Sequence, residues 1–384
     1  MVTYPQGWET YRVIDVADLF DNLRIPVTKN QRRPGNTPYY GANGIQDYVD
    51  GYTHDGEFVL IAEDGANDLL NYPVTYAKGK IWVNNHAHVI SARKSVADTK
   101  FLYYLLKKVD YTASLVGGTR AKLNGKTFKN IEITLPSNTL EQKAISSILS
   151  DLDNHIDNLG RLIEKKKSIR DGALEDLISG KTRLGGFEGD WQDTTIGDCV
   201  YILQGGTPST TNANYWNGNI VWVTPSEITK LKGMFISDSE RKITEAGLKN
   251  SSAQILPAGT ILLCSRATIG ELAIASKPMT TNQGFKNLVC KVGIDNVFMA
   301  YLLSTLKDIM ISKAKGTTFL ELSKKALETI KVKIPKYEEQ QAIASVLTVM
   351  DKEIEHLEAE RDKMIQIREG AMDDLLTGRV RLTV

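Results

Sequence analysis

The sequence is poor in cysteine and has neither long apolar runs nor an excess of one charge. Its three cysteines, Cys199, Cys264 and Cys290, are too far apart in sequence to form a CxxC pair. This spacing indicates buried free thiols in a reducing compartment rather than a disulfide framework. No apolar run reaches the roughly 18 residues of a membrane span, and no basic segment followed by an apolar core opens the chain. We therefore expect a soluble, cytoplasmic protein with no membrane contact.

The charge balance excludes a polycation but leaves room for a local basic surface. The 384 residues include 47 Lys and Arg against 46 Asp and Glu. A protein can bind nucleic acid through a basic patch even when its net charge is near zero. With 42% hydrophobic and 24% charged residues, the composition is that of a folded protein, and the length favours two domains.

Motifs of self-contained catalysis are also missing. Gly125-Lys-Thr127 lacks the upstream glycine of a phosphate-binding loop, because Arg120 stands there. The sequence contains no HExxH, no GxSxG, no glycine-rich dinucleotide turn and no Asn-Pro-Pro-Tyr. His86-Ala-His88 has no third metal ligand at a convincing spacing. Glu63 and Asp64 follow a predicted strand, as nuclease carboxylates can, but no Glu-x-Lys accompanies them. We expect no catalytic residues, no metal and no cofactor in this chain.

What the sequence does contain is an internal duplication. Glu141-Gln-Lys-Ala-Ile145 returns 198 residues later as Glu339-Gln-Gln-Ala-Ile343, and the same offset links Gly180-Lys-Thr-Arg-Leu184 to Gly378-Arg-Val-Arg-Leu382. Each copy follows a β-like stretch that ends in proline, whereas the segments between the copies share little sequence. The predicted order is a domain, a long helix, a second domain and a second long helix, at 1–135, 136–184, 185–335 and 336–384.

The duplicated segments have the apolar spacing of a coiled coil. Thr139 and Gln142 suggest a capping box, and Gly180 and Gly378 suggest helix ends. About 40 residues lie between these signals, so each helix would be about 60 Å long. Because such a helix is marginal alone, we expect an antiparallel pair with approximate two-fold symmetry; the alternative is a surface helix on each domain. The predicted helix-pair seam is Ile145, Leu149, Leu152, Ile156, Leu159, Ile343, Leu347, Met350, Ile354 and Leu357.

Each domain is expected to be α+β with a mixed, strongly curved sheet. Buried strands are predicted at 58–62 and 261–264, and short helices at 99–109 and 297–309. The segment 81–90 alternates as one strand with Asn84, His86 and His88 on one face.

Polar, aromatic and basic loops recur at corresponding places in the two halves. Such side chains contact phosphates and base edges, although each loop taken alone could be an ordinary solvated turn. Arg266 could read a guanine or form an internal ion pair, and Trp216 could contact DNA or pack in the core. Lys122, Lys126 and Lys315 are expected to contact phosphate. The candidate DNA-binding residues are Asn43, Asn84, His86, Arg120, Lys122 and Lys126 in the first half, and Thr207, Ser209, Tyr215, Trp216, Arg266, Thr268, Asn282, Gln283, Lys315 and Thr317 in the second.

With these features the chain resembles the DNA-specificity (S) subunit of type I restriction-modification systems over essentially its whole length. The duplicated entry and exit of the long helices carry the resemblance. They are joined by Gly205-Gly-Thr-Pro-Ser209, Ser265-Arg-Ala-Thr-Ile-Gly270, Asn282-Gln-Gly284, Tyr40-Gly-Ala-Asn-Gly44 and Glu63-Asp-Gly65.

The resemblance implies that each domain is a target-recognition domain reading one half of a bipartite site in double-stranded DNA. The helices would fix the spacer between the two halves of the site and would dock two methyltransferase (M) subunits. Restriction (R) subunits would then join the complex. S-adenosylmethionine, ATP and Mg would then belong to those partners. Two other hypotheses stay open: a scaffold that binds proteins only, and a stand-alone DNA-modifying enzyme.

Overall fold

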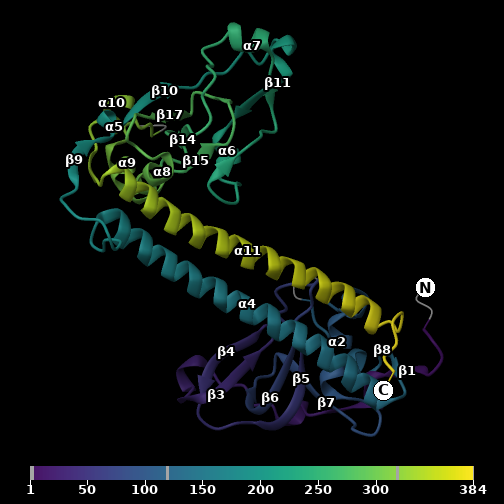
Figure 1. Ribbon diagram of the computed structural model, residues 1–384. Coiled ribbons are helices and arrows are strands. Elements are labelled where there is room, and N and C mark those ends of the chain that lie inside the picture. Colours follow the sequence, from purple (N-terminus) through teal and green to yellow (C-terminus); the bar gives the residue numbers. More distant parts are fainter. Residues whose placement is uncertain (1–3, 118–120, 317–319, 384) are drawn as a thin grey trace. The chain divides into compact units, whose positions relative to one another are not determined.

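Two compact units make up the protein, and each of them contains parts of both long helices. The computed structural model describes residues 4–117, 121–316 and 320–383 (Figure 1). The first unit combines Met1–Asn158 with Arg361–Val384, and the second is Leu159–Glu360. Helix α4 (Thr139–Ser179) has 41 residues and α11 (Tyr337–Leu375) has 39, which confirms the two predicted long helices. The finer four-part division of the chain stays a prediction.

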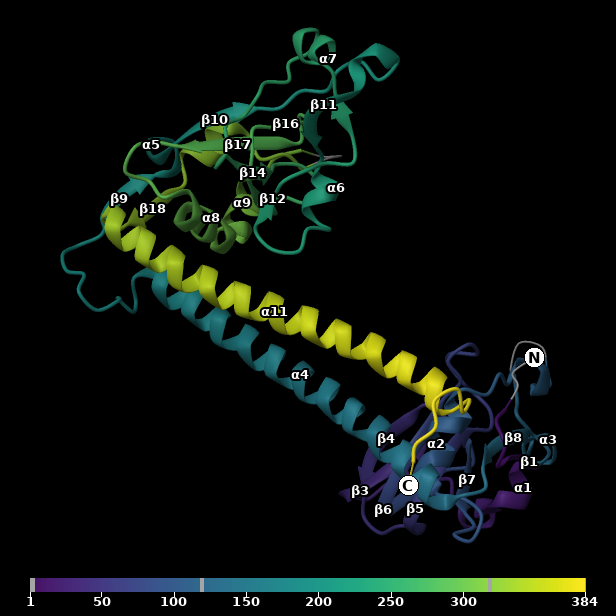
Figure 2. The ribbon, with the colours of Figure 1, turned by 45° about the vertical axis from the view of Figure 1, so that its right-hand side comes forward.

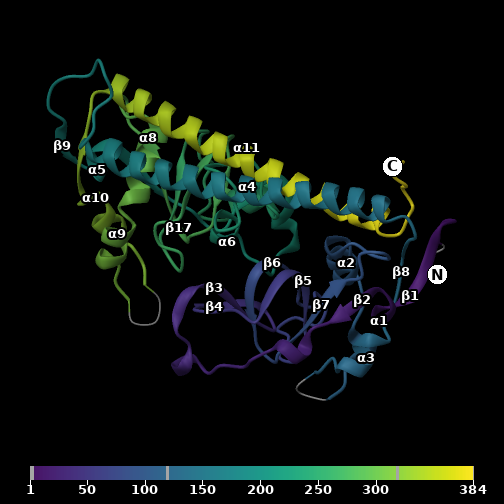
Figure 3. The same ribbon diagram turned by 90° about the horizontal axis from the view of Figure 1, so that it is seen from below.

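The first domain is built on a mixed six-stranded sheet in the order β2-β7-β5-β6-β3-β4. Strands β3 and β6 pair in parallel, and the other neighbours are antiparallel. Helix α2 (Thr99–Lys107) lies between this sheet and α4 (Figure 3). The other elements are β1 (Trp8–Arg12), α1 (Val13–Val16), β2 (Ala17–Leu19), β3 (Pro34–Gly41), β4 (Gly44–Val49), β5 (His54–Ala62), β6 (Val74–Val83), β7 (Ala87–Ala92), α3 (Gly125–Lys129) and β8 (Glu132–Pro136).

The prediction of one continuous strand over 81–90 is wrong. Strand β6 ends at Val83 and β7 begins at Ala87, so Asn84 and His86 lie in a turn between them. The cause is local: the side-chain Oδ1 of Asn84 accepts the backbone N–H of His86 at 2.8 Å. An asparagine that bonds to the backbone two residues on favours a turn over an extended strand.

The second domain repeats the α+β plan with a divided sheet. Five strands follow the order β10-β17-β14-β15-β12 and three follow β13-β11-β16. Strands β9 and β18 form a separate pair next to the start of α11 (Figure 2). The elements are β9 (Gln192–Thr195), α5 (Ile196–Cys199), β10 (Val200–Gln204), β11 (Trp216–Val223), α6 (Pro225–Ile228), β12 (Phe235–Ile236), β13 (Lys242–Ile243), α7 (Glu245–Lys249), β14 (Ile261–Cys264), β15 (Leu272–Ala275), β16 (Thr280–Thr281), β17 (Phe285–Cys290), α8 (Asn296–Thr305), α9 (Lys307–Lys313), α10 (Lys324–Glu328) and β18 (Lys331–Ile334).

Within each unit, α4 and α11 run antiparallel and make equivalent contacts with their roles exchanged (Figure 1). In the first unit, Nη1 of Arg368 on α11 lies 3.2 Å from Oδ1 of Asp153 on α4. In the second unit, Nε of Arg170 on α4 lies 3.2 Å from Oδ1 of Asp351 on α11. Each arginine and each aspartate is 198 residues from its counterpart. The predicted antiparallel pair and its approximate symmetry therefore hold at the level of individual ion pairs.

The ten seam residues are all buried or half-buried, but they do not face the partner helix alone. Ile145 and Leu149 at the start of α4 belong to the core of the first domain, together with Met372 and Leu375 of α11. Ile343 and Leu347 play the same part in the second domain, with Leu177 and Ile178 of α4. The first turns of each helix therefore pack into a domain core as well as against the other helix.

The predicted capping box at the start of α4 is wrong, because the side chain of Gln142 bonds to the backbone of the domain and not to the helix start. Asn138 takes the capping position and its Oδ1 accepts from the N–H of Leu140 at 3.0 Å. The amide of fully buried Gln142 instead accepts from the backbone N–H of Asp98 at 2.8 Å and donates to Pro136 O at 2.8 Å. Gln340 makes the equivalent bonds in the second unit. The duplicated glutamine thus fixes each helix start to its own domain.

Helix ends and thiols follow the sequence predictions. Gly180 and Gly378 have φ angles of 72° and 71°, a left-handed conformation that favours glycine. The three cysteines are free; Cys199 and Cys264 are buried as predicted, whereas Cys290 is half-buried. Burial raises the pKa of the Cys264 thiol to about 11. Among the described residues, no helix has the length and apolarity to span a membrane.

A tyrosine in each domain donates to the helix-pair aspartates. Tyr104 Oη lies 2.7 Å from Asp153 Oδ2, and Tyr301 Oη lies 2.6 Å from Asp351 Oδ2. Tyr104→Phe should lower the free energy of unfolding by about 1.5–3 kcal/mol, because a hydrogen bond to a charged group contributes about that much. The control is Tyr103→Phe, which removes only an exposed contact with Lys107. Equal denaturation midpoints for the two variants would show that the Tyr104 bond adds no stability.

Candidate nucleic-acid interface

The two domains build the same polar turn at equivalent strand ends. The backbone N–H groups of Asn84 and Asn282 each donate at 3.1 Å to a carbonyl of the neighbouring strand, β3 or β11. Each asparagine Oδ1 also accepts, at 2.8 Å, from the backbone N–H two residues on. The two residues are 198 positions apart, as the duplicated helices are. Both predicted asparagines therefore hold a turn; Asn84 is 4% exposed and Asn282 is half-buried.

In the first domain, Asn43 and His86 lie against the loop 63–67, which follows β5. Asn43 Nδ2 donates to Gly65 O at 2.9 Å, and its Oδ1 accepts from the N–H of Asn67 at 3.0 Å. His86 Nδ1 makes a short hydrogen bond to the carboxylate of Asp64. The structure thus brings these predicted residues together at one edge of the sheet, where their outward faces are exposed.

Glu63 pairs with two of the basic side chains of the first domain. Its Oε2 accepts from Arg24 Nη1 at 2.7 Å, and its Oε1 lies 3.0 Å from Lys122 Nζ. Burial by itself raises the pKa of the Glu63 carboxyl, but the hydrogen bonds from the two cations outweigh it and lower the pKa. The Lys122 side chain is still 45% exposed. A phosphate contact by Lys122 would therefore compete with an internal ion pair, and it stays a prediction.

A cluster of metal-ligand type lies beside this pair. Ligand atoms of Asp21, Glu63 and His88 lie within 4.8 Å of one another. However, His88 Nδ1 is 2.7 Å from Asp21 Oδ2, and its Nε2 donates to Leu123 O at 2.8 Å. Both ring nitrogens are therefore used, and the protein's own cations already neutralise the carboxylates. We assign no metal to this cluster.

Lys286 in the second domain occupies the place that His88 occupies in the first. The two residues lie at equivalent positions of β17 and β7, 198 residues apart, and both are nearly fully buried. Lys286 Nζ lies 3.1 Å from Glu321 Oε1, and Arg266 Nη2 lies 2.9 Å from Oε2 of the same carboxylate. Burial raises the pKa of the Glu321 carboxyl, but these two cations outweigh it and lower the pKa. The structure therefore gives Arg266 the internal ion pair that the sequence left as an alternative.

The hydroxyl-rich loop after β10 is held against the Asn282 turn. Thr207 Oγ1 donates to Gln283 Oε1, and Ser209 Oγ lies 2.9 Å from Thr211 Oγ1. Gly205 is required because a Cβ there would lie 2.0 Å from Asn282 O. Thr207 is therefore bonded to Gln283 of the Asn282 turn, and exposed Ser209 lies two residues further along the same loop.

The remaining predicted residues divide by exposure. Trp216 is 8% exposed and belongs to a small aromatic cluster with half-buried Tyr215, so core packing describes it best. Thr268 is half-buried, whereas Lys126 and Lys315 are exposed. Arg120 and Thr317 lie outside the described residues.

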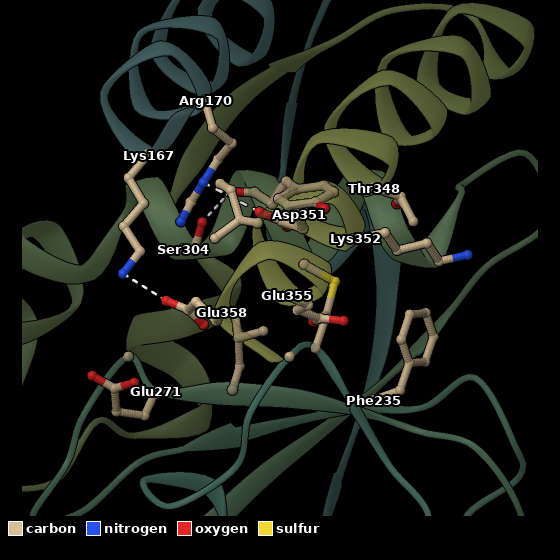
Figure 4. Close-up of a pocket in the computed structure, with 16 residues that line it drawn as sticks. Lys167, Arg170, Phe235, Glu271, Ser304, Thr348, Asp351, Lys352, Glu355 and Glu358 are labelled. Carbon is tan, nitrogen blue, oxygen red and sulfur yellow. Dashed lines mark hydrogen bonds and ion pairs between the residues drawn. The ribbon is translucent and has the colours of Figure 1, made fainter. Parts of the chain in front are cut away.

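A cavity of about 460 Å³ lies in the second unit, between the helix pair and the domain (Figure 4). Lys167 Nζ lies 2.7 Å from Glu358 Oε1 on its wall. Asp351 pairs there with an arginine of α4, and Glu271 with Lys307. The carboxylates of Glu358, Asp351 and Glu271 therefore face cations of the protein itself, and we assign no phosphate or catalytic site to this cavity.

Sequence reasoning missed Lys286 and Arg241. Lys286 could have been found, because the offset of 198 leads from His88 directly to it. Arg241 stacks on two tryptophans, and no local sequence signal points to it, since its neighbours include Asp238 and Glu240.

Two unlike domains on duplicated helices, each with a polar turn at the same strand end, define a two-domain protein with a repeated helical frame. A family model for the type I restriction modification DNA specificity domain matches residues 5–166 and 188–365. The chain therefore belongs to this family.

Individual relatives agree with the family match. The MjaIX specificity subunit of Methanocaldococcus jannaschii is 40% identical over 193 residues, 49% of this chain and 44% of that protein, so this match spans less than half of the relative. The putative specificity subunit S.HindORF215P of Haemophilus influenzae is 32% identical over 349 residues, 87% of this chain and 85% of that protein. The crystal structure of the S subunit from M. genitalium has a TM-score of 0.68 at 20% identity and covers 96% of each chain, which shows the shared fold.

Proposed function

We propose that this chain recognises a bipartite sequence in double-stranded DNA, with each domain reading one half. The observation that carries the proposal is the repetition of one frame around two unlike domains. Helix ion pairs, helix-start glutamines and strand-end asparagines recur at the 198-residue offset, while the loops around them differ. A repeated frame would position both domains on DNA in the same way, and the different loops would contact different base sequences.

The long helices would then set the length of the spacer between the half-sites. Half-sites about one helical turn of DNA apart, ~34–36 Å, need a stiff connection. Helices of 41 and 39 residues, paired by ion pairs and an apolar seam, can provide one.

Catalysis is assigned to partner subunits. The chain lacks catalytic motifs, and the carboxylates of its candidate interface face the protein's own cations. M subunits would bind S-adenosylmethionine, R subunits would bind ATP and Mg, and this chain would bind no cofactor. Because the helix contacts create two equivalent environments, we propose two M subunits, one at each. A complex acting on cellular or incoming DNA would work in the cytoplasm.

Selection from random duplexes tests this function. The complex with its M subunits should enrich two short sequence blocks separated by a gap of fixed length and random sequence. A single uninterrupted block would contradict reading by two domains. No enrichment would favour a scaffold that binds proteins only, and methyl transfer by the isolated chain would favour a stand-alone enzyme.

A further inference from the structure

Arg241 lies on the faces of two buried tryptophans in the second domain. Its guanidinium carbon is 3.7 Å from the ring centroid of Trp216 and 5.5 Å from that of Trp222. The two rings are nearly perpendicular, at 84° with centroids 5.0 Å apart. Trp216 and Trp222 are 8% and 4% exposed, whereas Arg241 is exposed. The aromatic pair is therefore a fixed platform that carries a solvent-facing cation.

The hydrogen-bond donors of Arg241 have no partner among residues 4–117, 121–316 and 320–383. Its guanidinium makes no hydrogen bond or ion pair with any residue in the described part of the chain. Arg266 is engaged by Glu321, and Arg32, which stacks on Tyr39 in the first domain, is engaged by Asp47. Stacking restricts an arginine side chain without consuming its N–H groups. Arg241 is thus held in place with its donors free.

The same platform also holds the hydroxyl-rich loop. Trp222 Nε1 donates to Gly206 O at 2.8 Å, and Trp216 Nε1 donates to Ser209 O at 3.0 Å. Between these carbonyls lies Thr207, which bonds to Gln283. Arg241 therefore stacks on the same two rings that hold the loop carrying Thr207 and Ser209, and it adds a fork of donors beside the hydroxyl groups of that loop.

We propose that Arg241 is the specificity-determining arginine of the second domain and reads a guanine of its half-site in the major groove. This inference rests on the proposed function. A planar guanidinium can donate two parallel hydrogen bonds to O6 and N7 of guanine. No other base presents two acceptors side by side in the major groove. Arg266 is then a positioning residue, because it ties the segment around Glu321 to the end of β14.

The test uses Arg241→Lys and Arg241→Gln in the complete complex with M subunits. Binding is measured on duplexes in which each position of both half-sites is varied singly. Arg241→Lys keeps the charge but replaces the planar fork of donors by a single ammonium group, and Arg241→Gln removes the charge. We expect it to reduce discrimination for guanine at one position of one half-site by roughly 5- to 150-fold, with the other half-site unchanged.

Three results would overturn the inference. A uniform loss of affinity with an unchanged base preference and a weaker salt dependence would make Arg241 a phosphate contact. No change in binding would make it a surface residue. A loss of Arg241→Gln binding with a lowered melting temperature, while Arg241→Lys keeps full base preference, would make it a packing residue.

Controls separate this inference from the proposed function. Lys230→Gln removes an exposed cation of the same domain and should leave the preference at every position unchanged. If the unaltered complex selects no two-block motif, the proposed function itself fails. If it does select one and Arg241→Lys leaves every preference intact, only the role of Arg241 is refuted.

Discussion

Replacing Arg381 by alanine is expected to destabilise the first unit by about 2–4 kcal/mol. Arg381 Nε and Nη2 lie 2.6 and 2.8 Å from the two carboxylate oxygens of Glu141, at the start of α4. Glu141 is 2% exposed, and removing one partner of a buried ion pair leaves an uncompensated charge that costs about 3–5 kcal/mol. We take a smaller value because the Arg381 side chain is 40% exposed and water can replace part of it.

This contact also closes the chain ends of the first unit. Arg381 Nη1 donates to Gln6 O at 2.9 Å, as Arg183 Nη1 donates to Gly189 O at 2.7 Å in the second unit. In the second unit these two residues belong to one short continuous segment, whereas in the first they come from opposite ends of the sequence. Arg381 therefore holds the segment around Gln6 and the segment after α11 together, and its loss should loosen both segments.

Thermal unfolding and amide hydrogen exchange measure this effect. A loss of about 1 kcal/mol lowers the melting temperature of a domain of this size by about 2–4 °C. The melting temperature of the first unit should therefore fall by roughly 5–15 °C. Amides near both termini should lose protection. The control is Arg379→Ala, which removes an exposed ion pair with Asp374 and should change stability by less than about 0.5 kcal/mol. An equal loss of stability in the two variants would show that the ion pair of Arg381 with Glu141 contributes no more than an exposed one.

Inserting one heptad into both long helices is expected to lengthen the DNA spacer. Seven residues preserve the seam and add about 10 Å to each helix, which corresponds to about three base pairs. Methylation of the original motif should be lost, and the same two half-sites should be modified with the longer gap. Sequencing methylated DNA from cells that make the variant and its M partner reads this directly.

A heptad placed in only one helix is the matched control. It shifts the arginine–aspartate pairs of one helix against the other, so neither spacer should be modified. If the double insertion left the original spacer in place, the helices would not set it.

The helix pair could be predicted because its determinants lie close together in sequence. Ile145 and Leu149 mark the seam by spacing alone, and the copy at Ile343 and Leu347 repeats it. What spacing could not show is that these first turns also enter a domain core. That depends on surfaces supplied by residues far away in sequence.

The site was less predictable because its contacts join distant segments. Alternation of polar and apolar residues predicts a strand at Asn84, whereas asparagine itself favours a turn. The Arg266–Glu321 ion pair joins residues far apart in sequence, so no pattern close to Arg266 predicts it. The tryptophan platform beneath Arg241 likewise comes from a different strand. Residue type predicted which side chains are polar, but not which of them are already occupied.

The most direct measurement of the central claim is base-resolution methylation sequencing of cells that contain this chain and its M partner. Reading by two domains predicts one asymmetric motif, with two short defined sequences on either side of a gap of constant length and variable sequence. A motif without a gap, or a gap whose length varies from site to site, would contradict it.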